Sequence, residues 1–323
     1  MKIRQILLSA IIPFSLTLSN ISAANSYNIT WLTQQNSGYY AINDSDQVVG
    51  MSGRCAFLWD KGVTTNLGTL PGGDYSWAEG INNSGQIIGG SYLNGTGGPH
   101  GFLWENGLMI DIGGNEGTGI NNLGQVIVDL ELGGNDFIWQ NGQVTYVGDI
   151  GRTRKINDVG DIIGYDESGP HQSPVGFLLT NGNKTMLGIQ NIPYAVNNNR
   201  QVVGQAGSNA FIWDGVNGIR ILDSQYSIAY GINDNGQVVG LTEGINGMRA
   251  FIWENGLLTD LNSFIPQSSN CVLEVAYGIN SRGDIVGCGY IDGTYHPYIL
   301  TIVPEPATLL LLGLGAMILR KKQ

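Results

Sequence analysis

One short stretch, residues 80–89, returns seven times along the chain with small changes. Each copy carries a β-branched residue, an Asn, two or three turn-prone residues, a Gln or Asp, and then usually two β-branched residues and a Gly. The spacing between copies is 36–47 residues, which is typical of a repeat architecture. The copies other than the one at Gly80 start at Ala41, Gly119, Lys155, Ala195, Gly231 and Gly278.

The centre of each copy predicts a tight β-hairpin. Asn and Asp accept hydrogen bonds from the backbone two residues on, and Gly adopts positive φ without a steric clash. Five copies have Gly where a type I turn with a bulge needs that conformation. Asp46 is tolerated at this position, but Arg200 fits it poorly, so we expect the fifth copy to turn differently. The five glycines are Gly85, Gly124, Gly160, Gly236 and Gly283.

A second motif, of the form Phe-Leu-Trp, follows each hairpin, as at Phe57–Trp59. In a strand, the Phe and Trp share one face and the aliphatic residue occupies the other, so both faces are apolar and the strand is sandwiched between others. Asn-Gly then turns the chain into another short strand, as at residues 105–112. Each repeat therefore predicts four short strands.

Four strands in roughly 40 residues are typical of a β-propeller blade, and a β-helix coil is shorter. The sequence thus predicts an all-β protein, a propeller with seven four-stranded blades. The last copy has no fourth strand before Pro304, whereas residues 28–32 look like a strand without a repeat. We expect this N-terminal strand to complete the last blade and close the ring. The alternative is an open, twisted array of β-meanders.

The two ends differ from the repeats. Residues 1–24 begin with Lys2 and Arg4, continue apolar and end in small residues, which is typical of a secretory signal peptide cleaved after Ala24, with Ala23 as the second choice. The alternative, a retained membrane helix, is disfavoured by Pro13 and by the short apolar run. The predicted domains are residues 1–24, the repeat domain 25–303, and a tail, 304–323.

The tail combines a Pro-Glu-Pro triplet, a 13-residue apolar run and a basic end, in that order. The run is short for a membrane span. The arrangement resembles the PEP-CTERM sorting signal of Gram-negative bacteria that make exopolysaccharide. This resemblance implies recognition by an exosortase during export, removal of the tail, only transient membrane contact, and delivery to the cell surface or extracellular matrix. The alternative is that the tail is retained as an anchor. The signal residues are Pro304, Glu305, Pro306, Arg320, Lys321 and Lys322.

The charge of the repeat domain limits which partners it can bind, and its cysteines bear on whether it forms a disulfide bond. Without both ends, 10 basic and 25 acidic side chains remain, so the repeat domain is a polyanion. A polyanion repels nucleic acid and anionic lipid, which excludes a nucleic-acid-binding function. Secretion permits a disulfide bond, and Cys271 and Cys288 are the candidate pair because they flank the last hairpin. The alternative is that the cysteines are small buried apolar residues.

The repeats also resemble the extracellular HAF repeat, named for His-Ala-Phe. The triplet appears here as His100-Gly101-Phe102 and in the variants Cys55-Ala56-Phe57 and Arg249-Ala250-Phe251, and the flanking Ile-Asn-x-x-Gly-Gln-Val-Val-Gly pattern matches over nearly the whole repeat domain. No copy spells His-Ala-Phe. The resemblance implies a secreted repeat protein and brings no catalytic residues, and the variability of the His position indicates a structural role.

Motifs for catalysis are sparse. There is no Gly-x-Ser-x-Gly elbow, phosphate loop or dinucleotide fingerprint. The repeats become acidic only after the second strand of the third and fourth copies. These carboxylates could line one cleft, as glycoside hydrolysis requires, or lie solvated on the surface of a polyanion. They are Asp129, Glu131, Asp166 and Glu167.

Two hairpin turns gather carboxylates as calcium loops do. Calcium takes six to eight oxygen ligands, and most copies offer few, so turn chemistry explains these residues without a metal. The calcium candidates are Asp44, Asp46, Asp158 and Asp161. No cofactor is expected.

The sequence therefore predicts a secreted, non-catalytic surface or matrix protein that presents a binding surface to exopolysaccharide or to a partner protein. The resemblance of the tail to the sorting signal is what points to polysaccharide, because fold alone does not give function. The alternatives are a carbohydrate-active enzyme, a glycoside hydrolase or lyase, that uses the four acidic residues, and a calcium-stabilised scaffold.

Overall fold

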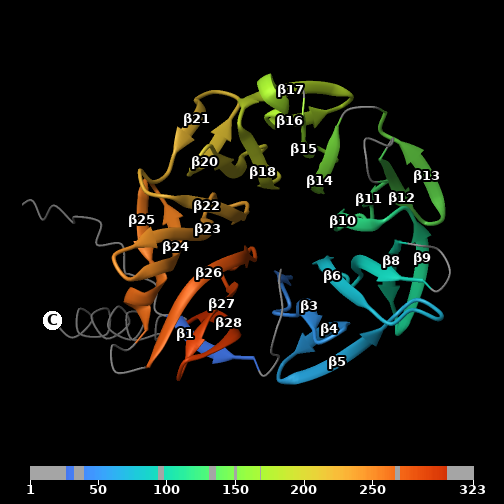
Figure 1. Ribbon diagram of the computed structural model, residues 1–323, viewed down its shortest axis with the longest axis horizontal. Helices are drawn as coiled ribbons and strands as arrows, with labels where there is room; N and C mark the ends of the chain where they lie inside the picture. The colour runs from blue at the N-terminus through green and yellow to red at the C-terminus, as the bar shows by residue number, and fades with distance from the viewer. Residues whose placement is uncertain are drawn as a thin grey trace, which may run out of the picture.

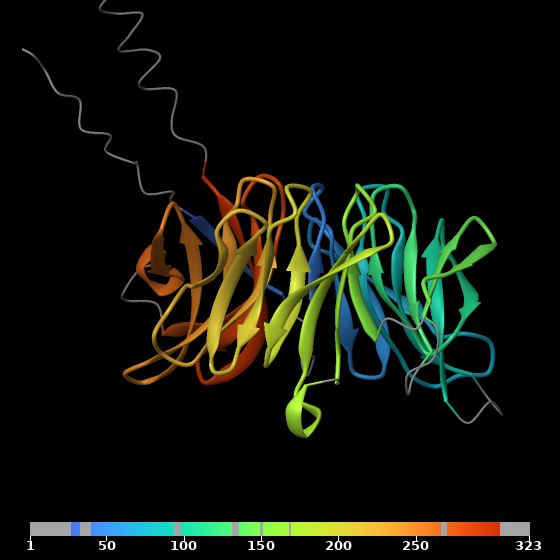
Figure 2. The same cartoon turned by 90° about the horizontal axis from the view of Figure 1, so that it is seen from above.

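The protein is a ring of seven four-stranded antiparallel blades around a central axis (Figure 1). The computed structural model describes residues 27–32, 40–93, 98–130, 136–148, 151–167, 169–265 and 270–303. Each blade is a meander whose first strand lies nearest the axis and whose fourth lies at the rim. The predicted propeller is confirmed. Turned on its side, the ring shows its blades standing next to one another (Figure 2).

The strand bounds follow the repeats. Blade 1 holds β2 (Ala41–Ile42), β3 (Val48–Ser52), β4 (Cys55–Asp60) and β5 (Val63–Gly68). Blade 2 holds β6 (Ser76–Ile81), β7 (Ile87–Tyr92), β8 (Pro99–Glu105) and β9 (Leu108–Gly113). Blade 3 holds β10 (Glu116–Ile120), β11 (Val126–Asp129), β12 (Phe137–Gln140) and β13 (Gln143–Tyr146). Blade 4 holds β14 (Arg152–Ile156), β15 (Ile162–Asp166), β16 (Val175–Thr180) and β17 (Asn183–Ile189).

The remaining blades have the same design. Blade 5 holds β18 (Asn191–Val196), β19 (Val202–Ala206), β20 (Asn209–Asp214) and β21 (Gly218–Ile221). Blade 6 holds β22 (Ser227–Ile232), β23 (Val238–Gly244), β24 (Gly247–Glu254) and β25 (Leu257–Asp260). Blade 7 holds β26 (Cys271–Ile279), β27 (Ile285–Ile291), β28 (Thr294–Ile302) and the N-terminal β1 (Tyr27–Trp31). Two short 3₁₀ turns, Pro170–Gln172 and Leu261–Phe264, lie between strands.

The ring is closed by the N-terminal strand. β1 pairs antiparallel with β28, from Tyr27 opposite Ile302 to Trp31 opposite Tyr298. Both partners of this pairing are far apart in sequence, so the first and last parts of the repeat domain must fold together. The expectation that the first strand completes the last blade is confirmed.

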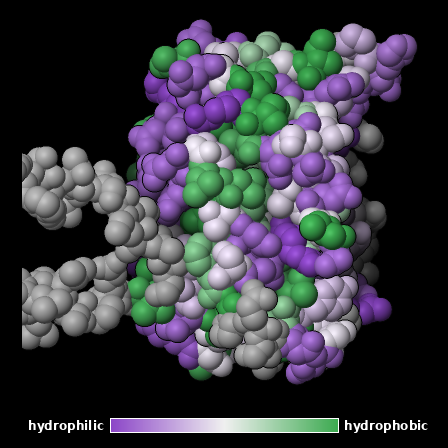
Figure 3. Space-filling model, turned by 90° about the vertical axis from the view of Figure 1, so that its left-hand side faces the viewer, coloured by the Kyte–Doolittle hydropathy of each residue, from purple (hydrophilic) through white to green (hydrophobic). Residues whose placement is uncertain are grey.

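The core lies between the blades. The paired β-branched residues of the second strands and the Phe of the third strands are almost fully buried; Phe102 of blade 2, for example, is 0% exposed. Phe102 and Trp104 pack in one cluster with Val49 of blade 1, whereas Leu103 packs in another with Val126 of blade 3. The third strands therefore have two apolar faces, as the sequence predicts, and each face packs against a different neighbouring blade. On the rim, apolar side chains are interspersed with polar ones (Figure 3).

In each blade, the turn between the first and second strands depends on its Asn. In blade 1, the side-chain oxygen of Asn43 accepts hydrogen bonds from the N–H groups of Ser45 and Gln47, each at 3.0 Å, and its Nδ2 donates to Gln47 at 2.8 Å. The same Nδ2 also donates to the carbonyl of Asn82 in the next blade, at 3.0 Å. Each hairpin thus binds its neighbour directly.

This inter-blade bond recurs in every blade and forms a closed cycle, which we call the Asn ring. Its seven donors are all 3–6% exposed. The bonds, from each side-chain Nδ2 to the next carbonyl, are Asn43 to Asn82, Asn82 to Asn121, Asn121 to Asn157, Asn157 to Asn197, Asn197 to Asn233, Asn233 to Asn280, and Asn280 back to Asn43, at 2.9–3.2 Å. We call the face of the propeller that carries these turns the Asn face, and the opposite face the open face.

The fifth hairpin corrects one expectation. Arg200 adopts the same positive φ, 61°, as Asp46, and its N–H donates to Asn197 as the glycines do in other copies. Its guanidinium Nε lies 2.9 Å from a carboxylate oxygen of Asp161 in blade 4, whose side chain is 2% exposed. This ion pair with a buried carboxylate offsets the strain of a left-handed Arg, so the fifth copy turns like the rest.

The expected disulfide is also corrected, because both candidate cysteines are free. On the β26–β27 ladder, Cys271 lies opposite Ile291 and Cys288 lies opposite Val275, so the two cysteines are displaced by three residues, or about 10 Å, along the strands. Cys271 packs against one core cluster and Cys288 belongs to another. A bridge would need Cα atoms within about 7 Å.

The Asn ring makes a prediction about stability. Asn121→Asp keeps the two acceptor bonds of the side chain but removes the donors to Gln125 and to the carbonyl of Asn157. That carbonyl keeps only its bond from the N–H of Gly160, and the new carboxylate is buried, so the free energy of unfolding should fall by about 2 kcal/mol or more. The exposed Asn183→Asp is the control and should change it little. Chemical denaturation measures both, and equal effects would show that the ring does not stabilise the propeller.

The cysteines make a second prediction. Burial raises the pKa of the Cys288 thiol to about 12, whereas Cys55 and Cys271 are only half-buried. Because the thiolate is the reactive form, iodoacetamide at pH 7.5 should modify Cys55 and Cys271 in the folded protein and Cys288 only after unfolding. Mass spectrometry counts the adducts. A single adduct in unreduced, unfolded protein would instead show a bridge.

Candidate functional site

The candidate site is a channel on the propeller axis. Its cavity volume is about 400 Å³, within the usual size of a small-molecule site. The channel is lined by the inner strands of all the blades and by the ends of β11 and β15. Its walls differ sharply between the two halves of the ring.

A ring of β-branched side chains lines the axis at the end of the channel next to the Asn ring. Each belongs to the residue directly before an Asn of the Asn ring, and three of them, Ile42, Ile232 and Ile279, also line the channel. The channel therefore extends from this ring towards the open face, where β10 and β14 begin. The ring consists of Ile42, Ile81, Ile120, Ile156, Val196, Ile232 and Ile279.

Tyrosines line one half of the channel. Tyr194, Tyr230 and Tyr277 occupy equivalent positions on β18, β22 and β26, and Tyr40 occupies the equivalent position just before β2. Neighbouring ring centroids are 5.3 Å apart from Tyr194 to Tyr230, 5.4 Å from Tyr230 to Tyr277 and 6.2 Å from Tyr277 to Tyr40. These spacings are typical of packed aromatic pairs, so the four rings form one continuous row, the tyrosine arc. Tyr40, which is 4% exposed, is the buried end of this row.

Charged side chains line the other half, in blades 2 to 4. Lys155 takes the position that is Gly or Ala in the other six copies, and its ammonium donates to the carbonyls of Thr118, at 2.7 Å, and of Glu79, at 3.4 Å. It thereby ties three neighbouring inner strands together. The charged residues of the channel wall are Glu79, Glu116, Asp129, Arg152, Arg154 and Lys155.

Burial in the channel shifts the pKa values of three of these groups. The pKa of Glu116 is raised to about 7, first by burial and then by the nearby charge of Glu79, although the indole N–H of Trp77 donates to its carboxylate at 3.0 Å. Burial also raises the pKa of Glu79, against the attraction of Lys155 and Arg154. Burial lowers the pKa of Lys155, against the attraction of Glu79. Glu116 can therefore gain or lose a proton near neutral pH.

The acidic residues expected to share a cleft do not all lie together. Asp129 lines the channel, but Asp166 lies 2.7 Å from the ammonium of Lys184 in its own blade and is not among the channel residues. Glu167 is exposed, and Glu131 lies outside the described residues. Of the expected residues that the structure describes, only Asp129 belongs to this site.

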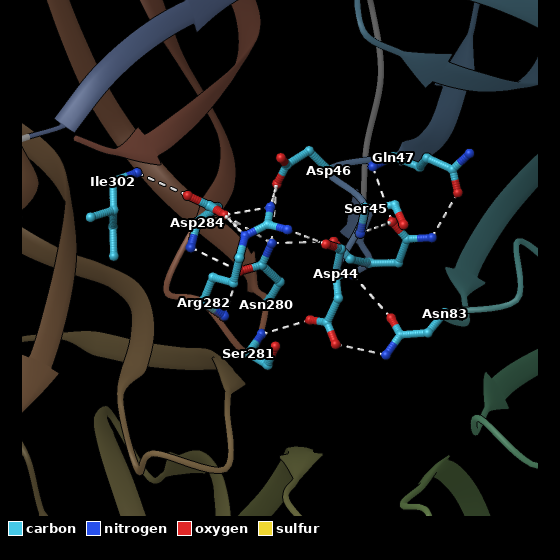
Figure 4. A network of polar contacts seen from close by, with 11 residues as sticks. Asp44, Ser45, Asp46, Gln47, Asn83, Asn280, Ser281, Arg282, Asp284 and Ile302 are labelled. Atoms are coloured by element: carbon cyan, nitrogen blue, oxygen red, sulfur yellow. Dashed lines mark hydrogen bonds and ion pairs between the residues drawn. The ribbon is translucent and has the colours of Figure 1, made fainter. Parts of the chain in front are cut away.

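The calcium candidates are engaged in contacts between hairpins. Asp44 accepts from the N–H of Ser281 and the amide of Asn83, and Asp158 accepts from Asn122. Asp46 is paired with Arg282, which also binds Asp284, at the junction of blades 7 and 1 (Figure 4). Asp161 is paired with Arg200, as described above. Within the described ranges, no group of three or more potential metal ligands is present.

The sequence carries a signal for the channel just outside the repeated motif. The position three residues before each ring Asn reads Tyr40, Glu79, Thr118, Arg154, Tyr194, Tyr230 and Tyr277. The side chain at this position differs from blade to blade, although the motif that follows it is nearly constant. The position lies one residue before the start of each repeat copy. Only the radial arrangement of the blades shows that these seven side chains meet on one axis.

Residues 303–322 match the PEP-CTERM protein-sorting motif. That motif marks an exported, surface-sorted protein that an exosortase processes during export. The six predicted signal residues fall in this match and lie outside the described residues, as does the predicted signal peptide 1–24. No helix within the described ranges is long and apolar enough to cross a membrane. No curated protein matches the chain.

Solved structures share the fold. The β-propeller domain of the Trilobed protease from Pyrococcus furiosus is similar at a TM-score of 0.56 and 10% identity, over 84% of this chain and 94% of that one. That domain is described as having an open velcro topology, whereas β1 closes the ring here. An extracellular domain assigned to a one-component system of B. thetaiotaomicron has a TM-score of 0.51 and 10% identity, over 84% of this chain and 39% of that one.

The raised pKa of Glu116 makes a prediction. Because its pKa is about 7 in the folded protein and lower when unfolded, the folded state holds the extra proton, and stability falls as the pH rises from about 5 to 7. Glu116→Gln removes this dependence. The stability of the variant relative to the wild type should therefore increase between pH 5 and pH 8 by about 2 kcal/mol. Denaturant titration at both pH values measures this.

The control for this experiment is the exposed Glu243→Gln, which should leave the pH dependence of the wild type intact. A stability difference between Glu116→Gln and the wild type that is the same at pH 5 and pH 8 would contradict the assignment.

Proposed function

We propose that the protein is a non-catalytic surface protein that binds polysaccharide in its axial channel. The tyrosine arc carries this proposal. The apolar C–H face of a sugar ring packs against aromatic rings, while its hydroxyl groups need the polar partners that the opposite wall supplies. The interpretation as an HAF-type extracellular repeat protein agrees with this function, and the sorting signal resembles that of bacteria that make exopolysaccharide.

The position of the chain end supports a role at the surface. Ile302, at the end of β28, donates its N–H to Asp284 at 2.9 Å (Figure 4). The chain therefore leaves the propeller beside the turn that joins β26 and β27 in blade 7. β1 starts on the same face, because Tyr27 lies opposite Ile302. The sorting motif thus follows from the Asn face, so the open face, with the channel, points away from the chain end that the sorting machinery handles.

A second function, a carbohydrate-active enzyme, is favoured by one observation. Glu79 and Glu116 both line the channel with raised pKa values, and a protonated carboxyl beside a second carboxylate can act as general acid and base. In this alternative, Glu79, Glu116 and Asp129 would be the catalytic carboxylates instead of the four acidic residues expected from the sequence. We favour binding over catalysis. Glu79 lies close to Lys155, and Glu116 accepts a hydrogen bond from Trp77, so both carboxyl groups are held in the channel wall by other residues.

The test uses residues 25–303, which contain all the strands. Isothermal titration with exopolysaccharide fragments from the producing cell should show binding that Tyr230→Ala weakens at least tenfold, because one stacked ring contributes about 1.5 kcal/mol. Tyr146→Ala, on the rim and 66% exposed, is the control and should bind like the wild type. Thermal melting checks that both variants fold.

The same mixtures also separate the two functions. If Tyr230→Ala folds and binds as well as the wild type, the channel is not the site. If the polymer shortens with time and Glu116→Gln stops the shortening, the protein is an enzyme and the non-catalytic proposal is wrong.

A further inference from the structure

Arg154 stands out among the charged groups of the channel. It lies on β14, the inner strand of blade 4, one residue before Lys155. Its guanidinium carbon is 5.3 Å from the ring centroid of Tyr165 and 5.0 Å from that of Tyr194, so it packs against both rings. Contacts of this kind fix the plane of a guanidinium and leave its N–H groups free to donate outwards.

Within the described part of the chain, these N–H groups have no acceptor. Two arginines of the hairpin turns, in contrast, are paired: Arg200 with Asp161, and Arg282 with Asp46 and Asp284. Arg154 makes no ion pair and no hydrogen bond with any described residue. The neighbouring cation, Lys155, donates instead to two backbone carbonyls of the channel wall. The two adjacent cations therefore have different roles, and of these two only Arg154 offers its donors to the cavity. Arg152, the third cation of the wall, is exposed at the start of β14.

We propose that Arg154 binds a carboxylate of the ligand and that the polysaccharide is therefore acidic, with uronic-acid units. A planar carboxylate matches the fork of a guanidinium with two parallel hydrogen bonds. Tyr194, which contacts Arg154, is also the first ring of the tyrosine arc. A carboxylate held by Arg154 would place the sugar ring that carries it on this arc. The inference deepens the proposed function and rests on it.

The charge of the whole domain makes local recognition necessary. Outside its two ends the chain has 10 basic and 25 acidic side chains, so it repels polyanions at long range. At 0.15 M salt this repulsion is screened beyond about 8 Å, whereas a contact inside the channel is screened much less. An acidic sugar would bind here through a specific site and not through the general charge of the surface.

The test compares acidic and neutral forms of the same sugars. Oligomers of galacturonate, glucuronate and mannuronate are titrated into residues 25–303 at 0.15 M salt. Each is used in two forms, with its carboxylates unmodified (the acid) and with them methylated (the ester). The ester keeps the ring and its hydroxyl groups but has no charge. We expect at least one acid to bind at least tenfold more tightly than its ester, as two charge-assisted hydrogen bonds imply.

Variants assign the preference to one residue. Arg154→Gln should remove the difference between acid and ester, and Arg154→Lys, which keeps the charge but loses the planar fork, should restore only part of it. Arg220→Gln is the matched control, because Arg220 packs 4.7 Å from the Trp253 ring outside the channel and should leave the preference unchanged. Thermal melting monitors folding, and the comparison of acid and ester on the wild type stands even if a variant does not fold.

The outcomes separate this inference from the proposed function. If the esters or the cell's own polymer bind and the acids have no advantage, or if the advantage survives in Arg154→Gln, the acidic-ligand inference is wrong and the binding function stands. If no oligomer and no native polymer binds, both are wrong.

Discussion

The propeller depends on one repeated hydrogen bond, from each ring Asn to the carbonyl of the Asn in the next blade. A single side chain closes its own hairpin turn and ties that turn to its neighbour, so local structure and ring assembly use the same group. The cycle returns from Asn280 to Asn43, across 237 residues of sequence. Because every bond is buried near the axis, where solvent competes least, the ring fixes the mutual distance of all seven inner strands.

That fixed frame allows the channel wall above it to vary. The Asn must make the hydrogen bonds of the ring, and the β-branched residue before it lies next to the ring on the axis. The residue three positions before the Asn instead projects into the cavity. The chain uses this freedom to place Tyr at four of these positions and Glu, Thr and Arg at the others. The chemistry of the channel wall thus changes from blade to blade while the hairpin turns beside it stay the same.

The sequence predicted the blades, their number and the closure by the N-terminal strand, because turn chemistry and strand alternation are local and recur seven times. It failed where tertiary contacts decide. Arg200 looked incompatible with a left-handed turn, and only the proximity of the buried Asp161 carboxylate, 39 residues away, explains it. Cys271 and Cys288 looked like a pair across a hairpin, but the ladder register separates them. The channel was missed because convergence on an axis cannot be seen along one strand.

The division of the channel limits what can fill it. The tyrosines come from four consecutive blades, 5, 6, 7 and 1, and the charged residues from blades 2 to 4, so the two kinds of wall face each other instead of alternating. A wholly apolar ligand would leave the charged wall without polar partners. A fully charged one would leave the aromatic surface uncovered. The ligand proposed above, a sugar ring with one apolar face and an edge that carries hydroxyl groups and a carboxylate, would contact both walls at once.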